Sequence, residues 1–168
     1  MRISEAMLPE VEHEMAQTRK ALARVPDDKF KFKPHEKSME MGALALHIAM
    51  MADWGADTLS NDSFDVAPVG GSAYQMPVAN NTAEVLALYD KAVVRLKQAL
   101  AATENEAMMQ PWSLLQGGKP LFTMPRAAVI RGMILNHMVH HRGQLTVYLR
   151  MNGVPVPALY GPSADEQQ

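Results

Sequence analysis

Residues 125–153, PRAAVIRGMILNHMVHHRGQLTVYLRMNG, carry the clearest structural signal in the chain. Apolar residues recur in this stretch at every third or fourth position, which is the period of an amphipathic helix. Pro125 is a favoured first-turn residue, and Asn152-Gly153 is a typical C-terminal stop. The stretch therefore predicts one long helix whose apolar side faces a core.

Three further segments show the same helical period, and no strand pattern competes with them: residues 4–24, 39–60 and 81–102. Asn81 and Glu84 have the spacing of a capping box, and Ser38 is a candidate N-cap. We therefore predict an all-α fold, a four-helix bundle formed by a single domain over residues 1–168.

Long connections separate the predicted helices, at residues 26–37, 61–80 and 103–124. Connections of this length permit crossovers and supply enough chain to cover one end of the bundle. Pro155, Pro157 and Pro162 stop any further helix, so we expect an extended tail from about residue 153.

The composition excludes several classes of protein. The chain has 168 residues, of which 48% are hydrophobic and 20% charged, as in an ordinary soluble domain. The net charge of −2 provides no general attraction for nucleic acid. The chain has no cysteine, which excludes disulfides, thiolate ligands and a cysteine nucleophile. Because we find neither a signal peptide nor a membrane helix, we expect a cytoplasmic protein without membrane partners.

A histidine pair four residues apart, His137 and His141, is the strongest functional signal. Side chains at this spacing share a helix face, with Cβ atoms roughly 5–6 Å apart, so two imidazoles can hold one metal ion. On a helical wheel both point towards the core, whereas His140 lies at the edge of the apolar stripe. A His137–His140 pair also has a suitable spacing, but the wheel favours His141.

The same wheel places the residues around this pair. Gln144 and Tyr148 lie on the histidine face, and with His140 they are candidates to surround the metal ligands. His140 could equally be a partly buried histidine without such a role. Arg142 lies on the opposite side of the helix.

His47, in the segment 39–60, is the candidate for a third ligand. Its helix face is apolar, so a metal on one ring nitrogen and a hydrogen bond at the other would satisfy the imidazole. The alternative is a core histidine bonded to backbone or water. Three histidine ligands with an open fourth position are typical of a catalytic site. Zinc and nickel both suit imidazole, and iron is also compatible.

Other candidate residues have simpler interpretations. We interpret Asp53 and Asp57 as surface charges and Trp54 and Trp112 as packing residues. The pair Gly117-Gly118 is a turn signal.

Over nearly its whole length the chain resembles the DinB/YfiT-like group of metalloenzymes. The resemblance rests on the segments MGALALH (41–47), HMVHHRGQL (137–145), VPVPALYGPS (154–163), VPDDK (25–29) and KPHEKS (33–38). It implies a four-helix bundle with crossover connections, a homodimer, and metal ligands at His47, His137 and His141. Some members of this group transfer or isomerise substrates with low-molecular-weight thiols such as mycothiol or bacillithiol.

The leading functional hypothesis is a metalloenzyme that transfers a low-molecular-weight thiol to an electrophilic small molecule, as in detoxification or a stress response. A metal-dependent hydrolase is the alternative. A non-catalytic metal-binding or dimeric scaffold is the second alternative, because Met138 follows His137 where zinc proteases carry a general base. We assign no catalytic side chain. The reacting group would be a water or a thiol at the metal.

Two glycines provide a separate argument for a homodimer. Gly132 and Gly143 lie about 20° apart on the wheel, opposite the metal face. Glycine inside a helix costs about 1 kcal/mol relative to alanine, so two on one face indicate that another backbone approaches closely. Leu135 lies near this face, and we expect it to be exposed. The close neighbour is either a helix of the same bundle or a second copy of the chain.

Overall fold

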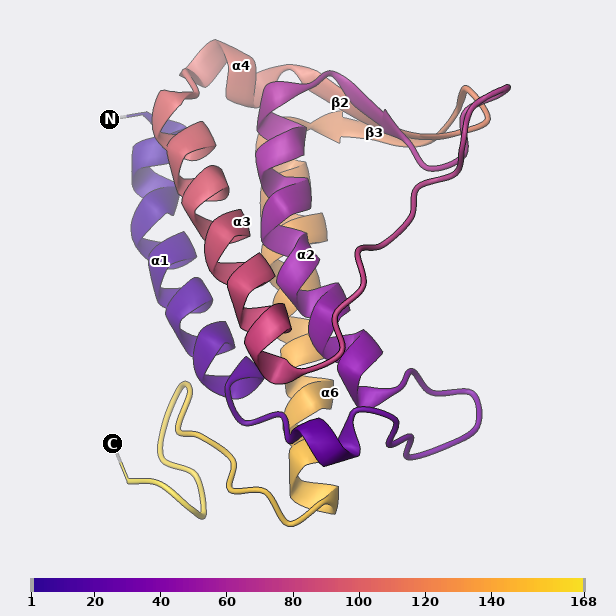
Figure 1. Ribbon diagram of the computed structural model, residues 1–168. Helices are drawn as coiled ribbons and strands as arrows, with labels where there is room; N and C mark the ends of the chain where they lie inside the picture. Colours follow the sequence, from indigo (N-terminus) through magenta and orange to yellow (C-terminus); the bar gives the residue numbers. More distant parts are fainter. Residues whose placement is uncertain (1, 168) are drawn as a thin grey trace.

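The computed structural model describes residues 2–167, and helices dominate it (Figure 1). Four long helical segments lie side by side: α1 (Ile3–Leu22), α2 (Met41–Ser60), α3 (Thr82–Ala102) and a composite helix over residues 126–151. The composite helix consists of α5 (Arg126–Ala128), η2 (Val129–Asn136) and α6 (His137–Met151). The four predicted helical ranges are confirmed to within two residues. The predicted cap of α2 is wrong, because Glu40 and not Ser38 precedes its first turn.

The all-α prediction is wrong in one respect, because the connections form a three-stranded sheet. Its strands, in spatial order, are β1 (Ser63–Asp65), β2 (Pro111–Gln116) and β3 (Lys119–Pro125). Two short helices also lie in the connections: η1 (Asp27–Lys29) and α4 (Asn105–Met109). β1 is parallel to β2, and β2 and β3 form an antiparallel hairpin. The strands have only 3 to 7 residues and contain prolines, so they show little alternation in sequence.

Asp65 ties the parallel strand to the hairpin. Its carboxylate accepts hydrogen bonds from the backbone N–H groups of Gly117 at 3.1 Å and Gly118 at 2.7 Å. Both glycines have positive φ angles, 60° and 74°, which residues with a Cβ rarely adopt. The turn expected at Gly117-Gly118 is confirmed.

The long connection after α2 is a crossover. Figure 1 shows that α2 and α3 run in the same direction, so the chain between them returns along the length of the helices. The sheet lies at the end where α2 finishes, as expected of connections long enough to cover one end.

The apolar core lies between the four long helices. Each helix contributes fully buried side chains, for example Leu22, Ile48, Leu96 and Leu145. Asn81 caps the start of α3 by accepting a hydrogen bond from the backbone N–H of Glu84 at 2.9 Å, as the capping-box spacing indicated. No helix within residues 2–167 is long and apolar enough to cross a membrane.

Arg142 is the main correction to the helical wheel, because its side chain is only 1% exposed. Its guanidinium donates to the Glu14 carboxylate at 2.7 Å, to the Glu14 carbonyl at 3.1 Å and to the Thr18 hydroxyl at 3.0 Å. The helix α6 therefore buries two faces, one against α2 and one against α1. A wheel drawn for a single buried stripe cannot show the second face.

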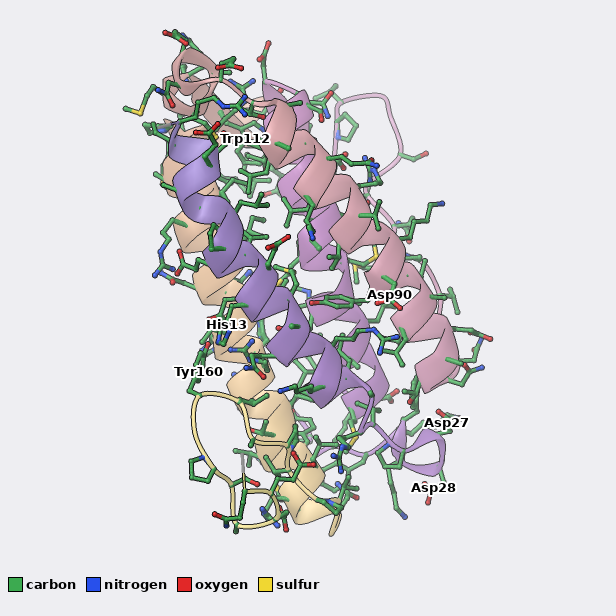
Figure 2. The ribbon with its side chains drawn as sticks, turned by 90° about the vertical axis from the view of Figure 1, so that its left-hand side faces the viewer. His13, Asp27, Asp28, Asp90, Trp112 and Tyr160 are labelled. Carbon is green, nitrogen blue, oxygen red and sulfur yellow. The ribbon has the colours of Figure 1, made fainter. Side chains whose placement is uncertain are left out.

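Tyr160 in the C-terminal tail completes this cluster, beside His13 of α1 (Figure 2). Its hydroxyl donates to the Glu14 carboxylate at 2.7 Å, and its ring lies 5.0 Å from the Arg142 Cζ. Two further ion pairs hold the tail: Arg24–Glu166 and Arg150–Asp165. The predicted tail is thus extended but folds back onto α1 and α6.

The segment η2 departs from α-helical geometry. It is a π-helix, which has more residues per turn than an α-helix, so each residue advances by less than the 100° assumed in the wheel. Leu135, which we expected to be exposed, is only 1% exposed and belongs to the core. A Cβ added at Gly132 or Gly143 would meet no described atom within 4 Å. A tight contact with a neighbouring helix of the same molecule therefore does not explain these glycines.

Arg126 joins the start of the composite helix to the end of α2. Its Nε donates to the Thr58 carbonyl at 3.0 Å, and its Nη2 donates to the Asn61 carbonyl at 3.1 Å and to Asp62 at 2.6 Å. A cation at this position satisfies carbonyls that the helix end leaves unpaired, and it complements the negative end of the helix dipole. These contacts fix the end of the molecule that carries the sheet.

We predict that Arg142→Met lowers the free energy of unfolding by about 3–5 kcal/mol, because it leaves the buried Glu14 carboxylate without its cation. Arg95→Met is the matched control. Arg95 pairs with Asp53 and Asp57 at the surface, and its loss should cost less than about 1 kcal/mol. Urea unfolding followed by circular dichroism measures both values. Equal losses in the two variants would contradict a structural role for the buried pair.

Candidate metal centre

Three histidines from two helices converge on one point. His47 comes from α2, and His137 and His141 come from successive turns of α6. One ring nitrogen from each lies within 4.8 Å of the others, and the ring centroids are 4.6 to 5.2 Å apart. The structure thus brings together the three residues that spacing, wheel and family resemblance had selected.

The position of His47 keeps its imidazole neutral. Its neighbours Leu46 and Ile48 are buried, and its ring stands edge-on to Trp54 with centroids 5.3 Å apart. Burial lowers the pKa of His47 to about 4, with smaller contributions from the charges of His141 and His137. At neutral pH this side chain therefore offers an uncharged ring with one free lone pair, which is the form that binds a metal.

His137 follows the π-helical segment directly, and π-helical turns are frequent at functional sites. Burial lowers its pKa first, and the neighbouring His141 lowers it further, whereas a hydrogen bond to the Met133 backbone opposes the change. This second imidazole is therefore also biased towards the neutral form.

Gln144 orients the third imidazole. The Nδ1–H of His141 donates to the amide oxygen of Gln144 at 2.6 Å, because an amide oxygen can only accept. The lone pair of His141 then lies on Nε2, which faces the Nε2 of His137 at 2.9 Å. The amide nitrogen of Gln144 donates to the exposed His140 at 3.1 Å. Gln144 and His140 thus lie where residues around metal ligands are expected.

Tyr148 lies elsewhere. Its hydroxyl donates to the Met39 carbonyl at 3.3 Å, and its ring packs edge-on against Phe32 with centroids 5.9 Å apart. Both partners belong to the connection before α2. Tyr148 therefore anchors that connection to α6, and no described contact joins it to the three histidines.

A cavity of about 350 Å³ opens beside His47 and His137. Its wall is mostly apolar and aromatic, and its other lining residues are Trp54, Asp57, Thr58, Phe64, Val66, Tyr74, Met76, Trp112, Leu114, Phe122, Val129, Met133 and Ile134. Trp54 and Trp112, interpreted from sequence as packing residues, are part of this wall. We did not identify the sheet residues of this wall from the sequence. The aromatic residues inside the two long connections were the signal that could have indicated them.

The donor set fits a divalent metal ion. Imidazole nitrogens suit zinc, nickel and iron, and three of them from two helices leave coordination positions free. The group includes no carboxylate within the described part of the chain, so a bound ion would keep its full positive charge. The three-histidine cluster could therefore bind a divalent metal.

Comparison with known proteins shows what the chain is similar to. It is 28% identical over 155 residues to the uncharacterized protein YrdA of Bacillus subtilis (strain 168), a match that covers 92% of this chain and 86% of YrdA. A solved DinB-like protein from Bacillus cereus ATCC 10987 has a TM-score of 0.71 and 22% identity, over 93% of this chain and 97% of that one.

A second solved structure, the DinB-like protein YjoA of Bacillus subtilis, has a TM-score of 0.68 and 17% identity, over 97% of this chain and 99% of that one. At these identities the two structures share the fold with this protein. The sequence model of the DinB family matches residues 2–168, which is nearly the whole length of the chain. The chain therefore belongs to the DinB family.

Proposed function

We propose that the protein holds one divalent metal ion, zinc or nickel, on His47, His137 and His141 and transfers a low-molecular-weight thiol to an electrophilic small molecule. One observation carries this proposal: a cluster of three imidazoles, in which burial lowers the pKa of His47 and of His137, borders an apolar cavity of about 350 Å³. When bound, such an ion supplies a Lewis acid that lowers the pKa of a thiol or a water molecule towards neutrality.

The chain's own residues would prepare the site. Gln144 keeps the proton of His141 on Nδ1, so the Nε2 lone pair remains available. Trp54 shields His47 from one side, and the apolar wall keeps water away from the cavity. The thiol must come from outside, because the chain contains no cysteine.

Thiol transfer fits this cavity better than hydrolysis does. A metal-bound water that attacks an ester or amide is normally assisted by a positioned general base as well. Among the described lining residues, Asp57 carries the only carboxylate, and that carboxylate accepts from Arg95 at 2.9 Å. A thiol loses its proton more readily than water and attacks as a strong nucleophile without a dedicated base.

We predict that the protein binds one zinc or nickel ion per chain. Alanine at His47, His137 or His141 should abolish stoichiometric binding, and Gln144→Leu should weaken it about 10- to 100-fold because the His141 ring loses its partner. His140→Ala is the matched control, since His140 is exposed and lies outside the cluster. Elemental analysis and calorimetry measure these values. If His140→Ala lost binding while His141→Ala retained it, the ligand pair on α6 would be His137 and His140, and our assignment would be wrong.

We predict that the metal-loaded protein accelerates conjugation of bacillithiol or mycothiol to 1-chloro-2,4-dinitrobenzene. In this reaction a C–S bond forms, the C–Cl bond breaks, chloride leaves with the bonding electrons and the thiol proton passes to solvent. His137→Ala should reduce the rate to that of the metal-free protein, measured by absorbance of the product. Turnover of 4-nitrophenyl acetate without thiol, and no conjugation, would instead favour a hydrolase; no turnover of either would favour a scaffold.

We also propose a homodimer formed through the outer face of α6. Gly143 and Val147 lie one turn apart on this face, and Val147 and Met151 are each more than half exposed. A Cβ at Gly143 would meet no described atom within 4 Å, so a second helix has room to approach. A two-fold axis through this face would make the contact self-complementary.

Light scattering should therefore report a mass near twice 18.5 kDa. Val147→Glu should yield monomers, because it introduces like charges across the two-fold axis. Val94→Glu is the control, since Val94 on α3 is 54% exposed, against 57% for Val147. A monomeric wild type would refute the dimer, and equal effects of the two substitutions would refute this interface.

A further inference from the structure

We propose that the cavity beside the histidines binds an uncharged aromatic molecule. This inference names the substrate class of the proposed function and, as a statement about a reaction, rests on it. Binding of the aromatic body, however, depends only on the cavity wall and can be measured without metal or thiol.

Two walls from different parts of the chain enclose the cavity. The helical wall includes Trp54 and Ile134, and the sheet wall includes Phe64, Trp112 and Phe122. A volume of about 350 Å³ is at the lower end of the range for small-molecule sites, about 300–1,000 Å³. It suits a molecule of one or two rings.

The aromatic side chains of the wall already interact edge to face. Tyr74 stands against Phe64 with centroids 5.3 Å apart at 80°, and against Trp54 at 6.3 Å and 73°. Trp112 and Phe122 differ from these pairs, because their rings are tilted by 45° with centroids 6.1 Å apart. An aromatic ring that enters this space meets both faces and edges of neighbouring rings, which is the arrangement that aromatic pairs prefer.

The two tryptophans of the wall contribute ring surface and no free donor. Trp112 is 6% exposed, and its indole nitrogen, which has no hydrogen-bond partner among residues 2–167, is closed off from the space of the cavity (Figure 2 shows its position at the sheet end). Trp54 donates to the Tyr74 hydroxyl at 3.1 Å. Neither indole N–H is therefore available to an acceptor on the ligand, which favours an apolar aromatic body.

The electrostatics of the wall favour an uncharged ligand. Within the described residues no lysine or arginine lines the cavity, so the metal-free protein offers an anion no cation to pair with. Asp57 lines one side, but its carboxylate is already paired with Arg95. A free cation would therefore find no unpaired carboxylate either.

Both tryptophans of the chain line this cavity, so intrinsic fluorescence reports its occupancy directly. Chelator-treated protein should be titrated with three brominated probes of similar size: 4-bromoacetophenone, 1-bromo-4-ethylbenzene and 4-bromobenzoate. Bromine quenches tryptophan at contact. We expect saturable quenching by the first two, with affinities within about threefold of each other, and roughly tenfold or more weaker binding of the carboxylate.

Two substitutions locate the ligand. Trp112→Phe should weaken binding of the ketone and of the hydrocarbon about two- to threefold each, because the smaller ring offers less contact area. Phe122→Ala should weaken both, whereas Leu121→Ala, on the same strand but outside the lining, should weaken neither.

Absence of saturable quenching in the wild type, or quenching that Trp112→Phe and Phe122→Ala both leave unchanged, would overturn the inference. These outcomes are separate from those of the proposed function. Binding without conjugation would refute the thiol transfer and leave the aromatic site in place. Conjugation of 1-chloro-2,4-dinitrobenzene without binding of any brominated probe would show that the substrate binds outside this cavity.

Discussion

The buried pair of Arg142 and Glu14 fixes the rotation of α6, and the histidine site depends on that rotation. Arg142 follows His141 directly, so a helix turned far enough to expose Arg142 would also move both α6 histidines away from His47. An unpaired buried charge is costly, which makes other rotations unfavourable. The same guanidinium also binds the hydroxyl of Tyr160, so the C-terminal tail closes over this polar cluster between α1 and α6.

A second constraint acts at the sheet end. Arg126 binds carbonyls at the end of α2, and Asp65 binds the hairpin turn, so the segments on both sides of the cavity are attached to the helix that carries His47. Polar contacts at the ends of elements thus set the distance between the helical wall and the sheet wall. The cavity between them exists because apolar side chains line it without filling it.

The sequence predicted the parts of the site that follow from helical period. The three histidines lie on single faces of regular α-helix, and α2 and α6 bring them together as the wheel indicated. Leu135 was misplaced because the π-helix η2 alters the phase, and the burial of Arg142 was missed because α6 buries two faces. The strands were missed because β2 and β3 are held largely by pairing and by Asp65, which leave no alternation to read. Tyr148 shares the histidine face but sits almost two turns beyond His141, too far along the helix to reach the cluster.

The site therefore combines two parts that differ in how much stability is lost when their residues are substituted. The histidines lie on helices whose buried residues form one continuous core, so substitutions beside them disturb the packing of the whole molecule. Phe64, Leu114 and Phe122 lie outside that core, on a small sheet attached at its edge. Their volume can change without opening a hole between the long helices, and the cost of such changes in stability is correspondingly small. A metal-binding group on the helices with a separate aromatic wall allows the same chemistry to be directed at different substrates, since the fold alone does not set the substrate.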